Sequence, residues 1–117
     1  MKKINIVKKS TDFTRIIKSK TPFKNKYFII YKENTNEDIY HFGISVSKKI
    51  GNAVVRNKLK RQIKSIIDKK DYKKGFNCII ILRKSVLDLT YQELENNLFK
   101  AIYTLQLEKG ENYEETN

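Results

Sequence analysis

The spacing of apolar residues predicts alternating strands and helices along the chain. Residues 27–32 (YFIIYK) are β-branched and aromatic, which is typical of a strand. Residues 40–46 place apolar side chains at every second position, as a strand with one buried face does. Residues 76–82 form an unbroken apolar run, which indicates a central strand covered on both faces.

Two helices are predicted before this last strand. Ser10 is expected to cap a short first helix, which ends before Pro22. A longer helix is predicted over residues 52–70, with Asn52 as its N-cap, because an asparagine oxygen can accept from a free N–H group of the first turn. Its apolar positions recur at helical spacing and define a face that packs on a core, formed by Val55, Leu59, Ile63, Ile66 and Ile67.

Thr90 and Glu93 have the spacing of a capping box, which opens a last helix. The predicted order is therefore α-β-β-α-β-α, with room for one more short strand. Because a strand, a helix and a strand follow one another, at least one strand pair must be parallel and joined by a crossover. We expect an α/β (α+β) fold, a small two-layer sandwich, in a single domain over 1–108 with a polar tail over 109–117.

Positive charge is concentrated in the predicted second helix and in the turn before it. Residues 48–64 carry seven Lys and Arg side chains, and no acid lies within 39–67. Arg56, Lys60 and Lys64 form a stripe beside the apolar face. Such a run is often only a solvated face, but cations that repel one another without any acid among them favour a polyanionic partner.

The charge is unevenly divided along the chain, whose net charge is +12. Residues 1–84 hold 23 basic and 6 acidic residues, whereas residues 85–117 hold 2 basic and 7 acidic ones. The final third is therefore not expected to face a polyanion.

Several classes of protein fit this composition poorly. The single cysteine, Cys78, cannot form an internal disulfide, and we expect a buried thiol in a protein of the reducing cytoplasm. No apolar run approaches the ~20 residues of a membrane-spanning helix, and no signal peptide is recognised. A stand-alone nuclease would need an acid–base pair or a metal cluster, but the only histidine is His41, within a predicted strand, and no Cys/His spacing suggests zinc.

Small residues line one face of the strand predicted over residues 40–46 and continue to residue 47. Gly43, Ser45 and Ser47 stand opposite the apolar row. Because small side chains leave room, a shallow groove is expected beside this face, open to an extended strand of another molecule.

Residues 42–61 (FGISVSKKIGNAVVRNKLKR) resemble the signature of the protein subunit of bacterial ribonuclease P. Residues 9–13, residues 27–31 and the last helix are similar to that family as well. The resemblance implies an α/β sandwich with a left-handed β-α-β crossover, in which the basic helix is the crossover. It also implies a protein cofactor without a nuclease site of its own. The RNA subunit of the family removes the 5′ leader of precursor tRNA with Mg²⁺.

The same resemblance assigns roles to particular residues. Three cleft positions have alternatives, since Phe13 and Ile17 would also suit a core, and Tyr31 could pack on the sheet. Lys58 stands where the family usually has Arg and projects away from the stripe, so little loss is expected. The residues implied to bind RNA are Lys48, Lys49, Asn52, Arg56, Asn57, Lys58, Lys60, Arg61 and Lys64. The residues implied to bind the leader in a cleft are Phe13, Ile17, Tyr31, Ser45 and Ser47.

The expected partners are the catalytic RNA subunit and precursor tRNA, with no membrane and no obligate protein partner. Mg²⁺ is expected to act mainly through the RNA subunit, and whether this chain binds a metal ion is left open. The alternative function is that of a general or ribosomal RNA-binding protein with no part in cleavage. Composition alone fits that alternative equally well.

Overall fold

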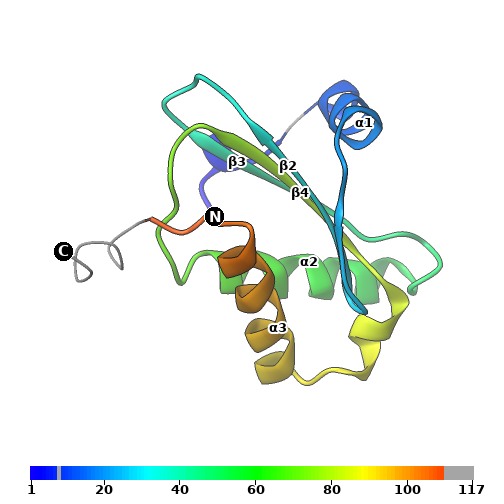
Figure 1. The fold of residues 1–117 in the computed structure, drawn as a ribbon. Coiled ribbons are helices and arrows are strands. Elements are labelled where there is room, and N and C mark those ends of the chain that lie inside the picture. The colour runs from blue at the N-terminus through cyan, green and yellow to red at the C-terminus, as the bar shows by residue number, and fades with distance from the viewer. Residues whose placement is uncertain (8, 110–117) are drawn as a thin grey trace.

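A four-stranded sheet organises the chain in the computed structural model, which describes residues 1–7 and 9–109 (Figure 1). The strand order is β1-β2-β4-β3, with β4 antiparallel to β2 and parallel to β3. Residues 76–82 therefore form a central strand, as predicted. The strands are β1 (Phe23–Lys24), β2 (Phe28–Asn34), β3 (Tyr40–Ser45) and β4 (Phe76–Leu82).

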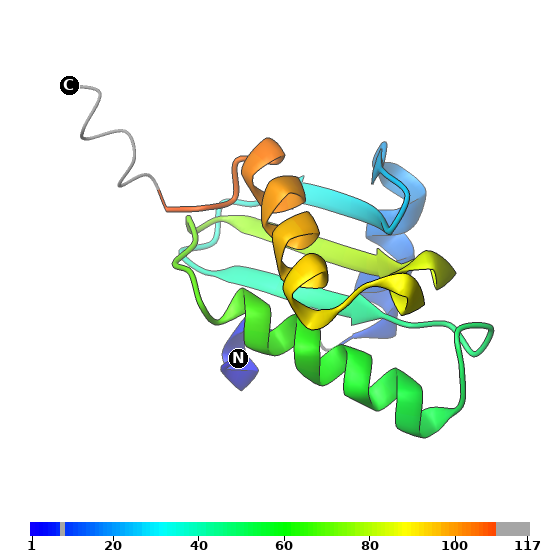
Figure 2. The same ribbon diagram turned by 90° about the horizontal axis from the view of Figure 1, so that it is seen from below.

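Helices cover both faces of the sheet. Figures 1 and 2 show α2 and α3 packed on one face, and α1 lying across the other. The sheet together with α2 and α3 forms the expected two-layer sandwich, and the predicted order gains only the short β1 and two 3₁₀ turns. The helical segments are η1 (Lys3–Asn5), α1 (Ser10–Ser19), α2 (Ala53–Ile67), η2 (Lys84–Asp88) and α3 (Tyr91–Thr104).

The basic helix α2 is the crossover between the parallel strands β3 and β4, as the order of elements requires. Its predicted cap is confirmed, since the Asn52 side chain accepts a hydrogen bond from the Val55 N–H at 3.1 Å. The helix ends at Ile67, earlier than predicted, and the Tyr72 hydroxyl donates to the Ile67 carbonyl at 2.6 Å. Its predicted apolar face is buried at Leu59, Ile63, Ile66 and Ile67. The hand of the crossover stays a prediction from the resemblance.

The ends of the other helices confirm one expectation and correct another. The capping box of α3 is formed, with the Thr90 N–H donating to Glu93 Oε1 at 2.9 Å and the Glu93 N–H to Thr90 Oγ1 at 3.1 Å. Ser10, however, is the first residue of α1 and not its cap. Lys9 holds the cap position in extended conformation, and its side chain makes no capping bond.

The C-terminal part of the described chain is tied to the domain. The Lys109 N–H donates to the Asp71 carbonyl at 2.9 Å. Lys109, the first residue of the predicted polar tail, is thus bonded to the domain, and the rest of that tail, residues 110–117, lies outside the described residues. Within the described part of the chain, no helix is long and apolar enough to cross a membrane.

The approach of α1 to the sheet depends on Gly43. A Cβ atom at this position would lie 2.5 Å from the tip of the Phe13 ring, closer than carbon atoms can approach. The small residue expected to leave room on β3 therefore does so, and part of that room is occupied by the ring of Phe13 from α1.

We predict that Gly43→Ala destabilises the protein by about 1–3 kcal/mol, because the added methyl group must displace the Phe13 ring. Chemical denaturation of the variant and the wild type measures this difference. Ser45→Ala, two residues along the same strand, is the matched control and should change the free energy of unfolding by much less. A Gly43→Ala variant as stable as the wild type would show that the ring moves freely.

Candidate nucleic-acid interface

The outer side of α2 and the turn before it carry the predicted RNA-binding residues. The apolar side of the helix lies on the sheet, so the cationic stripe sits at the edge of that contact, and Arg56, Lys60 and Lys64 are half-buried. Arg56 is also oriented by the backbone, because its Nε donates to the Gly51 carbonyl at 3.2 Å. The exposed members of the set are Lys48, Lys49, Asn52, Asn57, Lys58 and Arg61.

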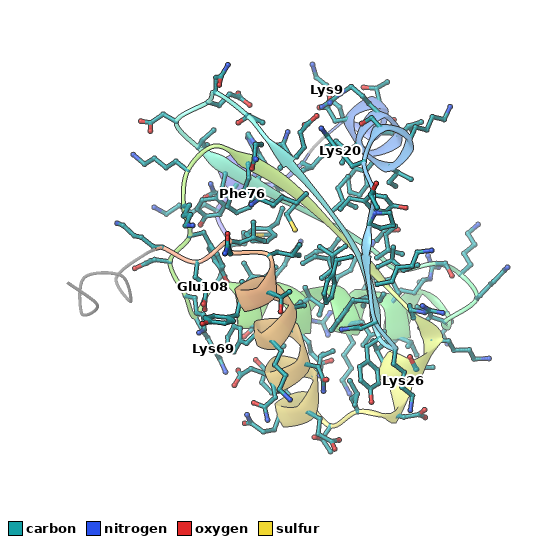
Figure 3. The ribbon with its side chains drawn as sticks, viewed as in Figure 1. Lys9, Lys20, Lys26, Lys69, Phe76 and Glu108 are labelled. Atoms are coloured by element: carbon teal, nitrogen blue, oxygen red, sulfur yellow. The ribbon has the colours of Figure 1, made fainter. Side chains whose placement is uncertain are left out.

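The seven cations of residues 48–64 make no ion pair within the part of the chain that the structure describes. The lysines that follow α2 behave differently: Lys69 pairs with Glu95, Lys70 with Glu108, and Lys74 with Asp38 at 3.3 Å. Figure 3 shows Lys69 and Glu108 on the side of α3. Among the described residues, the positive charge of α2 is thus left unpaired, while that of Lys69, Lys70 and Lys74 is neutralised.

Acids near α3, Glu95 and Glu108, supply two of these three pairs. The hydrogen bond from Lys69 holds the pKa of the Glu95 carboxyl below its usual value. Lys69 also lies 5.2 Å from the centre of the Tyr91 ring, and Lys70 lies 4.6 Å from that of Phe99. These contacts give the acidic final third a structural role. The surface of cations that pair with no described acid, which begins at Lys48, ends at Lys64.

The predicted cleft residues gather on the sheet face that carries α1. In the register of the strands, Tyr31, Ile79 and Gly43 form a row across β2, β4 and β3, and Phe13 contacts its Gly43 end. Ile16 is the fully buried residue of α1, whereas Phe13 and Ile17 are half-buried. Both therefore keep surface open to solvent.

The next row of residues on this face contains only one predicted cleft residue, Ser45. It consists of Ile29, Ile81 and Ser45, all half-buried. Alternation along β2 places Ile29 beside Tyr31, but Ile81 joins the row only through the pairing of β4, which no local pattern reveals. Ser47, the last predicted cleft residue, is exposed and lies beyond the end of β3.

A second group of cations, absent from the sequence prediction, lies where β4 ends. Arg83 follows Ile81 by two residues, so it continues the same face, and its N–H donates to the Tyr27 carbonyl at 2.8 Å. Its guanidinium donates to the Asn25 carbonyl at 3.2 Å, which joins two loops that are distant in sequence. The two loops together line an open cavity of about 550 Å³ that contains no acid. Its lining residues are Lys24, Asn25, Lys26, Arg83, Lys84 and Ser85.

The titratable residues of the described chain do not assemble a metal centre. Among the residues that the structure describes, no three His, Cys, Asp or Glu side chains lie close enough together to hold a metal ion. His41 is engaged by a neighbouring strand, with its Nδ1 at 2.8 Å from Asn77 Oδ1. Cys78 is fully buried, and burial raises the pKa of its thiol far above the usual range.

Comparisons with known proteins agree with this architecture. The family model Ribonuclease P matches residues 1–106. The chain is 45% identical over 105 residues to the ribonuclease P protein component of Mycoplasma capricolum, covering 87% of this chain and 96% of that protein. It is 44% identical over 117 residues to that of Streptococcus pyogenes, covering 98% of each.

A solved structure shows the same fold. The RNase P protein of Staphylococcus aureus superposes with a TM-score of 0.81 at 34% sequence identity, over 90% of this chain and 98% of that one. A small α+β RNA-processing subunit is therefore the class that fold and sequence define. The chain belongs to the ribonuclease P protein family.

We predict that Arg61→Ala weakens binding to RNA and that Lys69→Ala does not, since Arg61 forms no ion pair with a described residue whereas Lys69 is neutralised by Glu95. Affinities for a structured RNA measured over a range of salt concentrations test this. Arg61→Ala should lower the slope of log K against log salt by about 1. Equal losses from the two variants would mean that internal pairing does not decide which cations meet the RNA.

Proposed function

We propose that this chain is the protein cofactor of a ribonuclease P holoenzyme, which removes the 5′ leader of precursor tRNA. In this proposal the chain binds the catalytic RNA subunit through α2 and the precursor's leader on the sheet face beside α1. The observation that carries it is that the cations of residues 48–64, most of them on α2, form no ion pair with any described residue, in a chain of this family.

The first part of the function is anchoring of the RNA subunit. RNA offers a regular array of phosphates, and each cation that meets a phosphate releases a condensed counterion. Arg56 supports this role, because its bond to the Gly51 carbonyl fixes the guanidinium before RNA arrives. Preorganised side chains lose less conformational entropy on binding than free ones.

The second part is capture of the unpaired leader. Tyr31, Ile29 and Ile81 form a half-buried, mainly apolar surface, with Lys48 following β3 and Arg83 following β4. An aromatic side chain stacks on any base, and flanking cations follow the backbone, so a single strand binds with little dependence on sequence. A protein that meets many different leaders needs this tolerance.

The chemistry of cleavage is assigned to the RNA subunit, with Mg²⁺ activating the attack on the phosphodiester. The described residues of this chain assemble no group that fits a metal ion, so no step of the reaction is assigned to them. Their part is to neutralise phosphates and to hold the leader near the cleavage site. The partners of the chain are the RNA subunit and precursor tRNA, in the cytoplasm.

The proposal is tested by cleavage of precursor tRNA by a ribonuclease P RNA at low Mg²⁺, with and without this protein. We expect a large protein-dependent gain and no cleavage by the protein alone. Tight RNA binding without any gain would favour the alternative of a general or ribosomal RNA-binding protein. Cleavage by the protein alone would reveal an active site in this chain.

We predict that Tyr31→Ala lowers affinity for precursor tRNA by about 5- to 150-fold, the equivalent of one lost stacking interaction of about 1–3 kcal/mol. Affinity for mature tRNA and for the RNA subunit should not change. Tyr31→Phe keeps the ring and should keep the affinity. Tyr103→Ala is the matched control, because Tyr103 is 68% exposed on α3, on the other side of the sheet.

A further inference from the structure

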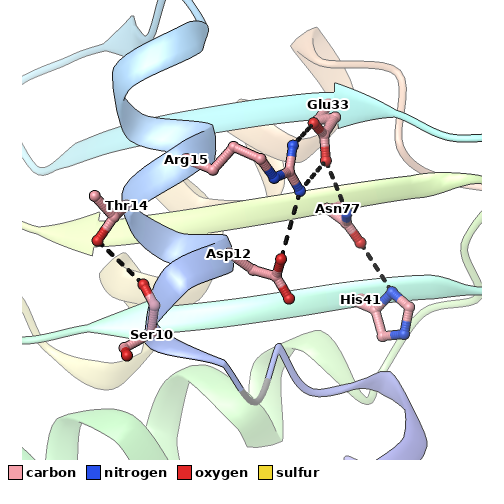
Figure 4. Close-up of polar contacts among 7 residues, drawn as sticks. All are labelled: Ser10, Asp12, Thr14, Arg15, Glu33, His41 and Asn77. Carbon is pink, nitrogen blue, oxygen red and sulfur yellow. Dashed lines mark hydrogen bonds and ion pairs between the residues drawn. The ribbon is translucent and has the colours of Figure 1, made fainter.

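The position of α1 rests on two different sets of contacts. The apolar set lies beneath the helix, where Ile16 is fully buried and Phe13 contacts Gly43. The polar set lies along one flank, where Arg15 of the helix contacts Glu33 of β2, and Glu33 is joined by hydrogen bonds to side chains of β4 and β3 (Figure 4). Apolar contacts are non-directional, so the polar set supplies the directional contacts of this ten-residue helix.

The polar set is a row across the sheet. Glu33 on β2, Asn77 on β4 and His41 on β3 are neighbours in the register of the strands. Asn77 Nδ2 donates to Glu33 Oε2 at 2.9 Å, and Asn77 Oδ1 lies 2.8 Å from His41 Nδ1. A single hydrogen-bonded chain therefore joins all three strands.

The donor and acceptor of each hydrogen bond in this row follow from the chemistry of the groups. A carboxylate only accepts hydrogen bonds, so the amide nitrogen of Asn77 must face Glu33 and its oxygen must face His41. The oxygen needs a donor, so the neutral imidazole of His41 carries its proton on Nδ1 and leaves Nε2 as an acceptor.

Arg15 fastens α1 to the end of this row. Its guanidinium contacts both oxygens of Glu33, with Nη2 at 3.1 Å from Oε2, and it also lies 3.7 Å from Asp12 of the same helix. The hydrogen bonds from Arg15 hold the pKa of the Glu33 carboxyl below its usual value, although burial acts in the opposite direction. The Glu33 side chain is only 12% exposed whereas Arg15 is 50% exposed, so the carboxylate is the shielded partner of the pair.

The geometry relates this row to the proposed leader surface. The row of Glu33 lies on one flank of the row of Gly43 that α1 contacts, and the row of Ser45 lies on the other flank. A shift of the helix toward either flank would therefore narrow or widen the surface left open for the leader.

We infer that Arg15, Glu33, Asn77 and His41 are a positioning network, which holds α1 in place and so sets the width of the leader-binding cleft. The inference rests on the proposed leader function. None of the four residues need touch RNA; they act through the placement of Phe13 and Ile17. A bidentate Arg–carboxylate contact suits this role, because it restricts orientation as well as distance.

The test compares Arg15→Ala, Arg15→Lys and Glu33→Gln in the reconstituted holoenzyme. The quantity measured is the ratio of affinities for precursor and mature tRNA, which a loss of stability alone would not change. We expect Arg15→Ala and Glu33→Gln to lower this ratio about tenfold, because small displacements of a binding wall are costly. Arg15→Lys keeps the charge but loses the two donors that contact both carboxylate oxygens, so its ratio should fall between those of these variants and the wild type.

The control is Lys74→Ala, which removes an exposed ion pair with Asp38 that involves no residue of α1 and should leave the ratio unchanged. An unchanged ratio in Arg15→Ala, with a clear preference for precursor in the wild type, would overturn the inference and leave the proposed function intact. A wild-type holoenzyme without that preference would instead overturn the leader function itself. Nitrogen NMR of His41 gives an independent readout, and a neutral ring protonated on Nε2 would contradict the network.

Discussion

The parallel pairing of β3 with β4 is the constraint on which the rest of this structure depends. Neighbouring parallel strands cannot be joined by a hairpin, so the chain between them must cross one face of the sheet, and it does so as α2. Burial of the apolar side of α2, centred on Ile63 and Ile66, then fixes the direction in which its other side points. A run of cations in the sequence thereby becomes a rigid surface.

Internal acids determine where this surface ends. Glu95 and Glu108 neutralise the lysines that follow α2, whereas no described acid pairs with the cations of residues 48–64. Because repulsion among unpaired cations destabilises the folded chain, a polyanion that binds this surface also relieves that repulsion. The division between paired and unpaired lysines therefore separates a structural role for charge from a binding role.

The two faces of the sheet serve different purposes. One is sealed by α2 and α3, whose buried side chains form most of the core with β4. The other is only partly covered by α1, which lies between a polar row ending at His41 and an apolar row ending at Ser45. The proposed anchoring of the RNA subunit and the proposed capture of the leader thus use mainly opposite faces, with Lys48 placed between the two.

The sequence by itself determined the elements whose signals are local. The apolar run of residues 76–82 specified a central strand, Asn52 and Thr90 specified helix starts, and the stripe from Arg56 to Lys64 specified a basic helix face. These signals reflect burial and capping within a few residues. The tertiary structure alone decided that Arg15 meets Glu33, that Ile81 joins Ser45, and that Arg83 meets the loop of Asn25. Such contacts depend on strand register and on segments distant in the chain, which local periodicity does not encode.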